Sequence, residues 1–263
     1  MPEGLACVAK QVTLPNGWRA RDYQIPAWKY LRDGGKRLVA CWHRRAGKDD
    51  VLLHATACAA MERPANYWHM LPQFAQCRKA IWDAVSAHTG KRRIFEAFPQ
   101  ELITNMNDTE MKIRFVNGST WQLVGSDHYN NLVGAGVAGA TFSEYALANP
   151  SAYAYIRPML EENNGWAAFI STPRGKNHFW EMIQNAQKRP DWFSEVLSIT
   201  DTRALSPEQV AASRQEYIDL YGEDMGEALF EQEYLCSFTA AIMGAFYGRE
   251  LTAVRNEGRL CAI

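Results

Sequence analysis

The stretch Arg37-Leu-Val-Ala-Cys-Trp-His-Arg-Arg-Ala-Gly-Lys-Asp-Asp50 decides the fold of this chain. It begins with a short apolar run, Arg37 to Trp42, that suits a buried strand, and it leads into Val51 to Met61, which is alanine-rich and helix-like. Backbone N–H groups of a tight loop at the start of a helix bind phosphate oxygens, and a lysine such as Lys48 adds positive charge for the terminal phosphates. The segment from His43 to Asp50 is therefore predicted to bind the phosphates of ATP.

Two positions depart from the usual phosphate-loop pattern G-x-x-x-x-G-K-[ST]. Trp42 stands at the first glycine, and Asp49 stands where a hydroxyl is usual. An isolated Gly-Lys pair also fits a solvated basic turn, but the strand before it and the helix after it favour the phosphate loop. The loop residues expected to contact the nucleotide are His43, Arg44, Arg45, Ala46, Gly47, Lys48, Asp49 and Asp50.

A second apolar strand is followed by an acid. Val137 to Phe142 leads into Ser143-Glu144, and in a P-loop site such a strand end supplies a carboxylate for Mg²⁺ and a glutamate for the attacking water. Glu144 is predicted to activate the water, but Ser143 stands where the metal-binding carboxylate normally lies. Because Mg²⁺ needs hard oxygen ligands whichever element supplies them, we expect Asp49 and Ser143 to bind the metal, directly or through water. The alternative is that Asp49 only caps the following helix.

The rest of the chain predicts an α/β fold, namely a P-loop NTPase of the RecA-like (ASCE) type with a mostly parallel central sheet flanked by helices. Asn117-Gly118 between alternating apolar residues predicts an inserted β-hairpin. Further strands are expected at Asn66 to Leu71 and Trp166 to Ile170. Helices are expected at Arg21 to Leu31, Gln73 to His88 and about 205 to 235. The domain is expected to span 1–236, with an irregular lead-in over 1–20 and a linker over 237–263.

Composition excludes several classes of protein. With a formal net charge of -1, the chain has no overall basic character, so nucleic acid would have to bind a local patch. One such patch is Lys91-Arg92-Arg93, although three charges also fit a solvated turn. The six cysteines include no Cys-x-x-Cys pair, which argues against a zinc site or a disulfide framework. No apolar stretch is long enough for a membrane span, and no signal sequence is evident, so a soluble cytoplasmic protein is expected.

Five motifs in order resemble the ATPase half of the large terminase subunit, the motor that packages DNA into tailed-phage proheads. The resemblance covers about residues 18 to 240. The motifs are Arg21-Asp22-Tyr23-Gln24, His43 to Lys48, Leu71-Pro72-Gln73 with Gln76 and Trp82, Phe142-Ser143-Glu144-Tyr145-Ala146, and Phe169 to Gly175.

The resemblance implies roles for residues at matching positions. Gln24, with Arg21 and Tyr23 nearby, would contact adenine, although Tyr23 and Gln24 also fit the simple start of a helix. Arg44 or Arg45 would neutralise charge on the γ-phosphate. The coupling motif that senses this phosphate would be Ser171, Thr172 and Pro173; a strand end stopped by proline is the alternative.

The family pattern is not complete in this chain. Many relatives carry an arginine before the glycine upstream of the acid strand, where this chain has Asn131-Leu132-Val133-Gly134. If that arginine acts across a subunit interface, Arg157 and Arg174 are candidate replacements. Family members also carry a C-terminal nuclease, but no cluster of metal-binding aspartates follows residue 240. Gly244 to Gly248 fits a linker toward such a domain, so an isolated ATPase domain that does not cut DNA is expected.

The function implied is Mg²⁺-dependent ATP hydrolysis that moves double-stranded viral DNA into a procapsid, in the cytoplasm of the infected host. The implied partners are DNA, the portal of the procapsid and a small terminase subunit, with self-association into a ring during packaging and a monomeric isolated domain. Two alternatives remain: another nucleic-acid motor such as a helicase, and a non-hydrolysing nucleotide-binding module. A helicase would need a second motor domain, and retention of Lys48 and Glu144 argues against loss of the chemistry.

Overall fold

The structure is a computed structural model that describes residues 14–86, 89–132 and 136–239, and the single residues 254, 257 and 259. Most of the predicted linker (237–263), including Gly244 to Gly248, and most of the predicted lead-in (1–20) lie outside the described residues. So do Val133 and Gly134 of the upstream segment. No helix of the described part is long and apolar enough to cross a membrane.

The described residues form eight strands and nine α-helices, and strands and helices alternate along much of the chain. The strands are β1 (Arg37–Trp42), β2 (Asn66–Leu71), β3 (Ile103–Asn107), β4 (Lys112–Phe115), β5 (Thr120–Gly125), β6 (Gly139–Ser143), β7 (Trp166–Ser171) and β8 (Trp192–Leu197). The helices are α1 (Ile25–Arg32), α2 (Lys48–Glu62), α3 (Phe74–Cys77), α4 (Arg93–Ala97), α5 (Ser151–Glu162), α6 (His178–Ala186), α7 (Ile199–Thr202), α8 (Pro207–Tyr221) and α9 (Glu223–Tyr234).

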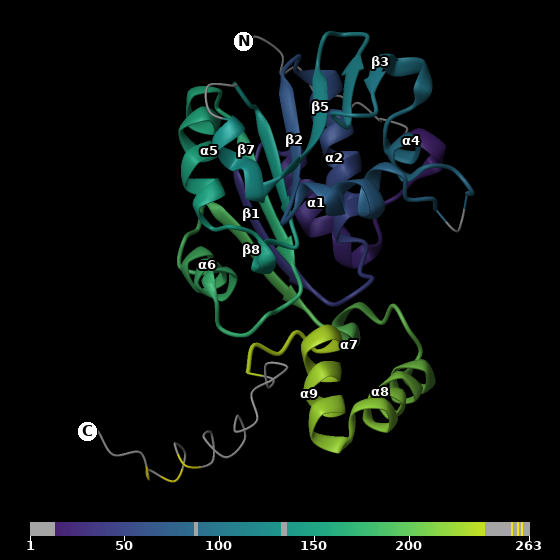
Figure 1. The fold of residues 1–263 in the computed structure, drawn as a ribbon, viewed down its shortest axis with the longest axis vertical. Helices are drawn as coiled ribbons and strands as arrows, with labels where there is room; N and C mark the ends of the chain where they lie inside the picture. The colour runs from purple at the N-terminus through teal and green to yellow at the C-terminus, as the bar shows by residue number, and fades with distance from the viewer. Residues whose placement is uncertain are drawn as a thin grey trace, which may run out of the picture.

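The strands form one sheet in the order β3-β4-β5-β2-β6-β7-β1-β8. In this spatial order, every neighbouring pair from β5 through β2, β6, β7 and β1 to β8 is parallel. β4 runs antiparallel to both of its neighbours, β3 and β5. Helices α5 and α6 lie on one face of the sheet and α1 and α2 on the other (Figure 1). This arrangement confirms the predicted α/β fold with a mostly parallel sheet and flanking helices.

The topology brings the two predicted motifs to one edge of the sheet. β1 and β6 are separated by a single strand, β7, and all three run parallel. Because parallel strands end at the same edge, the loop after Trp42 lies near Ser143 and near Ser171. Buried apolar side chains on these strands, such as Val39, Phe142 and Phe169, explain why the strands form the centre of the sheet.

The helix predicted from Gln73 to His88 was wrong in extent. The structure has only α3 and a π-type turn, Arg78–Trp82, closed by the Asp83 N–H donating to the Arg78 carbonyl at 2.8 Å. The chain then reverses, and Arg92 donates to the Trp82 carbonyl at 3.0 Å. The helix stops here because the N–H of Ser86, which a continuing helix would direct to the Trp82 carbonyl, instead donates to the Lys91 carbonyl at 2.9 Å.

The hairpin around Asn117-Gly118 is confirmed, since it joins β4 to β5. Sequence reasoning missed β3, which pairs with the outer side of β4, and β8, which pairs with β1. Both lie at an edge of the sheet and lack the continuous burial of the central strands.

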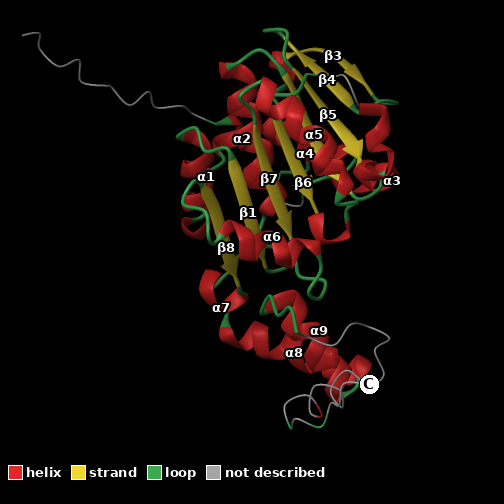
Figure 2. Ribbon diagram, turned by 90° about the vertical axis from the view of Figure 1, so that its left-hand side faces the viewer, coloured by secondary structure: helices red, strands yellow, loops and turns green. Residues whose placement is uncertain are grey.

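The predicted acidic helical region from about 205 to 235 is confirmed as two helices, α8 and α9, which meet at Gly222. They pack against each other beyond the end of β8 and away from the faces of the sheet (Figure 2). This pair lies next to the loop after β1, so α9 can contribute to the site.

Candidate functional site: a phosphate-binding loop at the carboxyl edge of the sheet

The phosphate loop turns sharply between β1 and α2. Gly47 has φ +74°, and a Cβ at this position would lie 2.8 Å from Gln24 Nε2. Glycine adopts this backbone without strain, and a Cβ here would displace the Gln24 amide from the Ala46 carbonyl that it binds. Lys48 is 8% exposed, and its ammonium donates to the carbonyls of Trp42 at 3.0 Å and His43 at 3.1 Å. The loop thus encloses a cation at the N-terminus of a 15-residue helix, which is the arrangement that binds phosphate.

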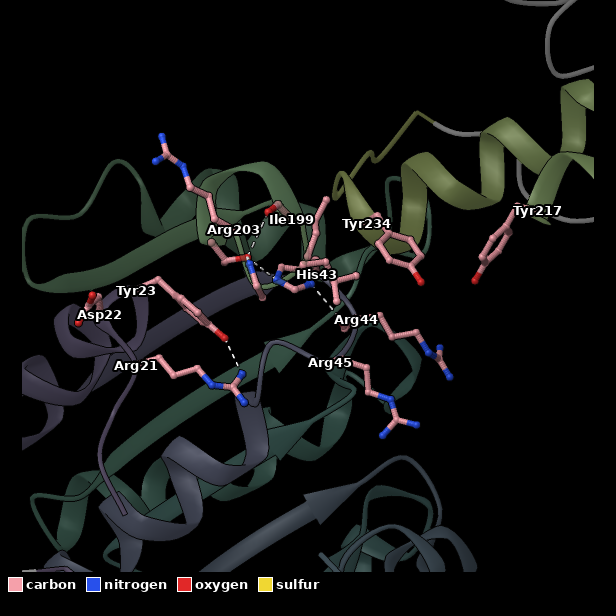
Figure 3. A pocket seen from close by; sticks show the side chains of 13 residues that line it. Arg21, Asp22, Tyr23, His43, Arg44, Arg45, Ile199, Arg203, Tyr217 and Tyr234 are labelled. Carbon is pink, nitrogen blue, oxygen red and sulfur yellow. Dashed lines mark hydrogen bonds between the residues drawn. The ribbon is translucent and has the colours of Figure 1, made fainter. Parts of the chain in front are cut away.

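The N-terminal motif packs beneath this loop. Gln24 is 2% exposed, and its Nε2 donates to the Ala46 carbonyl at 2.8 Å while its Oε1 accepts from the Arg21 N–H at 3.0 Å. Tyr23 also donates to the Ala46 carbonyl, at 3.1 Å, and accepts from Arg21 at 2.7 Å (Figure 3). The predicted adenine-contacting residues therefore lie together and brace the loop.

Trp42, at the place of the first glycine, belongs to the core. Its ring is 1% exposed, lies edge-on to Tyr23, and donates through Nε1 to Glu195 at 3.0 Å. Trp42 is the last residue of β1, and its side chain is buried against Tyr23 and Glu195, so it does not lie in the space of the phosphate loop.

The loop's basic side chains have different partners. Both nitrogens of His43 are engaged, with the Arg44 carbonyl at 2.7 Å and Thr202 Oγ1 at 2.8 Å, and burial lowers the pKa of His43. Arg44 pairs with Glu233 of α9 at 3.2 Å. Arg45 has φ +66°, a strained value for a side chain of this size, and makes no hydrogen bond or ion pair with another described residue.

Asp49 and Ser143 meet as expected. Ser143 Oγ donates to Asp49 Oδ1 at 2.6 Å, and His69 Nε2 donates to the same oxygen at 3.1 Å. Burial alone raises the pKa of Asp49, but the hydrogen bond from His69 and the charge of Arg93 at 4.0 Å reverse the shift and lower it. Asp49 is therefore a carboxylate whose hydrogen bonds go to β2 and β6, not to the helix backbone that capping requires.

The donor set suits Mg²⁺. Oδ1 of Asp49 accepts two hydrogen bonds, whereas Oδ2 has, among the described residues, only the Arg93 guanidinium at 4.0 Å. Ser143 Oγ acts as a donor to Asp49, so its own lone pairs remain available to a metal. A carboxylate oxygen and a hydroxyl oxygen side by side are the hard ligands that Mg²⁺ accepts.

Sequence reasoning missed His69 and Arg93 as parts of this site. His69, on β2, is completely buried, and its Nδ1 has no partner among the described residues. Arg93 reaches from α4 to Asp50 at 2.6 Å. For His69, a histidine in the middle of an apolar strand was a usable signal in the sequence. For Arg93 the sequence held no such signal, because the position of this residue depends on the chain reversal after Trp82.

Glu144 directly follows β6 in a left-handed conformation, with φ +49°. Its carboxylate accepts no hydrogen bond from the described residues. Burial raises the pKa of Glu144, and the nearby charge of Lys48 opposes that rise. A half-buried carboxylate with a raised pKa and free lone pairs is suited to accept a proton from water.

The predicted coupling motif lies at the end of β7, between the two other motifs. Ser171 Oγ accepts from the N–H of Ala146, two residues after Glu144, at 3.2 Å, and both Ser171 and Thr172 are buried. Arg174, directly after Pro173, pairs with Glu233 at 2.6 Å. The other candidate arginine, Arg157, is exposed and pairs with Glu161 within its own helix.

A cavity of about 670 Å³ opens beside the loop. Figure 3 shows Arg44 and Arg45 extending from the loop along this cavity, with Tyr217 and Tyr234 from α8 and α9 on its far side. Its wall therefore carries arginine and tyrosine side chains, which are able to contact phosphates and to stack on a base. The other lining residues are Arg21, Asp22, Tyr23, His43, Ile199, Thr202, Arg203, Ala204 and Leu205.

The basic triplet Lys91-Arg92-Arg93 does not present three free charges. Lys91 donates to Asn16 at 2.9 Å, Arg92 pairs with Asp83 at 3.0 Å, and Arg93 pairs with Asp50. These contacts argue against the triplet as a DNA-binding patch.

No family model matches the chain. The large terminase subunit of Escherichia phage T5 is 25% identical over 238 residues, which cover 88% of this chain and 50% of the relative. The large terminase subunit of Thermus phage G20c is 26% identical over 252 residues, with coverage of 84% and 49%. The chain thus spans about half the length of the curated relatives it matches.

Among solved structures, the large terminase ATPase domain of Thermus phage P74-26 matches with a TM-score of 0.63 at 25% identity, covering 84% of this chain and 95% of that domain. The large terminase of another thermophilic bacteriophage, in complex with ADP, matches with a TM-score of 0.63 at 15% identity, covering 84% of this chain and 54% of that protein. At 15% identity the second match concerns the fold alone.

The sheet order and the loop define the chain as an α/β P-loop NTPase. Within that class, the matches confirm the resemblance seen in the sequence: the chain is similar over most of its length to the N-terminal ATPase domain of phage large terminase subunits.

Proposed function

We propose that this chain hydrolyses ATP with Mg²⁺ and that the reaction drives double-stranded viral DNA into a procapsid. The observation that carries the proposal is that four residues converge at one edge of the sheet. They are Lys48, Glu144, and Asp49 with its hydrogen-bonded partner Ser143. Relatives of this chain are large terminase subunits, which supports packaging as the purpose of the hydrolysis.

Lys48 and the loop amides would bind the phosphates. The lysine ammonium now donates to two loop carbonyls, and phosphate oxygens, as stronger acceptors, would take over these bonds. Asp49 and Ser143 would bind Mg²⁺, which neutralises charge on the phosphates when bound. Glu144 would orient the attacking water and accept its proton, since burial raises its pKa.

The base of the nucleotide would occupy the cavity beside the loop. Arg21 and Tyr23 line one side of it, and the buried Gln24 holds both Arg21 and the loop through hydrogen bonds to the Arg21 N–H and the Ala46 carbonyl. The large terminase of the thermophilic bacteriophage that shares this fold binds ADP and ATP-γ-S. Arg44 or Arg45 would reach the γ-phosphate, and Arg45 has no partner to give up among the described residues. Such an arginine is worth about 10³–10⁵ in rate where it has been measured.

The wider partners belong to the same proposal. DNA would bind through its backbone, largely without regard to sequence, and the portal and a small terminase subunit would join the chain in a ring. The side chains of Lys91, Arg92 and Arg93 are already engaged with Asn16, Asp83 and Asp50, so this triplet is not proposed as the DNA contact.

A steady-state ATPase assay of the purified chain tests the proposal. Lys48→Ala and Glu144→Gln should each lower the rate at least about 100-fold, because one removes a phosphate ligand and the other the base. Lys79→Ala and Glu181→Gln, at exposed positions with the same side-chain types, should keep the wild-type rate.

If Lys48→Ala and Glu144→Gln keep the wild-type rate, the turnover comes from a contaminant and the proposal fails. If the wild type binds an ATP analogue but turns nothing over with Mg²⁺ and DNA present, the chain is a non-hydrolysing module. DNA-stimulated turnover lost in both variants is the result that the proposal expects.

A further inference from the structure

Glu233 of α9 is a buried carboxylate that binds arginines from two other segments. Its Oε1 accepts from Arg174 at 2.6 Å and its Oε2 from Arg44 at 3.2 Å. The backbone carbonyl of Glu233 also accepts from the Arg44 N–H at 2.8 Å. The Glu233 side chain is 9% exposed. Burial raises its pKa, but the two arginine charges outweigh that effect and lower it, so the carboxylate stays ionised.

Both arginines come from segments that are expected to contact the nucleotide. Arg44 lies in the phosphate loop, and Arg174 directly follows the coupling motif at the end of β7. Each also acts electrostatically on Glu144, so the pair lies near the end of the site where hydrolysis would occur. One carboxylate therefore joins α9 to two functional segments of the sheet.

Resting on the proposed ATP hydrolysis, we propose that Glu233 is a positioning residue: it binds Arg44 and Arg174 until the terminal phosphate of ATP takes them over. A guanidinium binds phosphate with the same paired geometry that it uses for a carboxylate. The γ-phosphate adds charge that ADP lacks, so ATP competes with Glu233 better than ADP does. The exchange would also remove both ion pairs between α9 and these segments and leave the backbone bond from the Arg44 N–H to the Glu233 carbonyl, which ties the hold on α9 to the nucleotide.

A purely structural role for Glu233 makes a different prediction. A buried carboxylate between two arginines stabilises the packing of α9, and its loss would lower stability while affecting ATP and ADP alike. The preference for ATP over ADP therefore separates the two roles, and stability alone does not.

The experiment measures the dissociation constants of the full chain for a non-hydrolysable ATP analogue and for ADP, with Mg²⁺, by calorimetry. Glu233→Gln should raise the preference for the ATP analogue about 3- to 10-fold, since freed arginines become available to the γ-phosphate. Adding Arg44→Ala to Glu233→Gln should remove most of that gain. The matched control Glu231→Gln takes the same charge from the same helix and should leave the preference unchanged.

An unchanged or reduced preference in a folded Glu233→Gln protein overturns the inference, because the arginines would then not be exchanged. The wild type distinguishes this failure from that of the proposed function: if it binds neither nucleotide, ATP hydrolysis itself is wrong. Glu233→Asp, which keeps the charge on a shorter side chain, provides a second folded variant and should show a smaller gain than Glu233→Gln.

Discussion

Exchanging Asp49 and Ser143 tests how the magnesium ligands are distributed. The perturbation is Asp49→Ser, Ser143→Asp and the double variant. In the wild type one carboxylate accepts hydrogen bonds from Ser143 at 2.6 Å and from His69 at 3.1 Å. The double variant restores one carboxylate and one hydroxyl to the same place, on opposite elements.

The energies follow from the geometry. Asp49→Ser leaves a buried donor on His69 without its carboxylate, which costs about 1–3 kcal/mol. Ser143→Asp places a second carboxylate within hydrogen-bonding distance of Asp49, and two like charges at about 4 Å repel by about 4 kcal/mol at an effective dielectric constant of about 20. Because that repulsion disappears in the double variant, we expect a favourable coupling of about 3–4 kcal/mol between the two substitutions.

Urea unfolding and Mg²⁺-dependent ATPase rates of the four proteins provide the assay. The double variant should unfold at a higher urea concentration than Ser143→Asp and should hydrolyse ATP faster than the worse single variant. Asp50→Ser with Ser143→Asp is the matched control: it keeps the repulsion and should recover nothing. Additive stabilities, or a double variant no more active than the worse single variant, would refute the exchange.

Three further predictions concern the same site. Gly47→Ala should lower the free energy of unfolding by about 1–3 kcal/mol in urea, because its φ of +74° and its approach to Gln24 admit no Cβ; unchanged stability would mean that the loop is more open than described. His69→Ala should raise the Mg²⁺ concentration needed for half-maximal ATPase, since Asp49 loses the donor that orients it, and an unaltered Mg²⁺ titration would contradict this role. The raised pKa of Glu144 means that its base form is lost, as pH falls, above the usual pKa range of a glutamate. Because the pKa of Glu144 is higher in the folded than in the unfolded state, stability falls as pH rises from the usual glutamate pKa to the raised one, and the full cost remains above it. Glu144→Gln should therefore be more stable than the wild type near neutral pH. Thermal unfolding measures this, and equal or lower stability would show that the carboxylate is not destabilised by burial.

The central strands could be predicted from the sequence because their burial is continuous. Arg37–Trp42 and Asn66–Leu71 have the predicted bounds, since apolar side chains on both faces leave little choice of structure. The edge strand Trp192–Leu197 could not be found in this way, because Ser194 and Glu195 interrupt its apolar pattern. Its position depends on pairing with β1, a contact more than 150 residues away along the chain.

The phosphate loop could be located from Gly47 and Lys48, and the pairing of Asp49 with Ser143 from the complementary departures at those two positions. The residues that contact them, such as His69, could not be predicted from the sequence. His69 and Glu233 reach the site through the order of the strands and the packing of α9, neither of which leaves a local signal in sequence. The lengths of helices were least predictable where the chain reverses, as after Trp82, because the backbone there pairs with residues further along the chain, such as the Ser86 N–H with the Lys91 carbonyl.

A crystal structure of the chain with a non-hydrolysable ATP analogue and Mg²⁺ tests the central claim most directly. It should show the phosphates bound to the amides of residues 43–48 and to Lys48, with Asp49 and Ser143 bound to the metal directly or through water and Glu144 facing the γ-phosphate. A nucleotide bound away from this loop, or a metal with no contact to Asp49 or Ser143 even through water, would contradict the account.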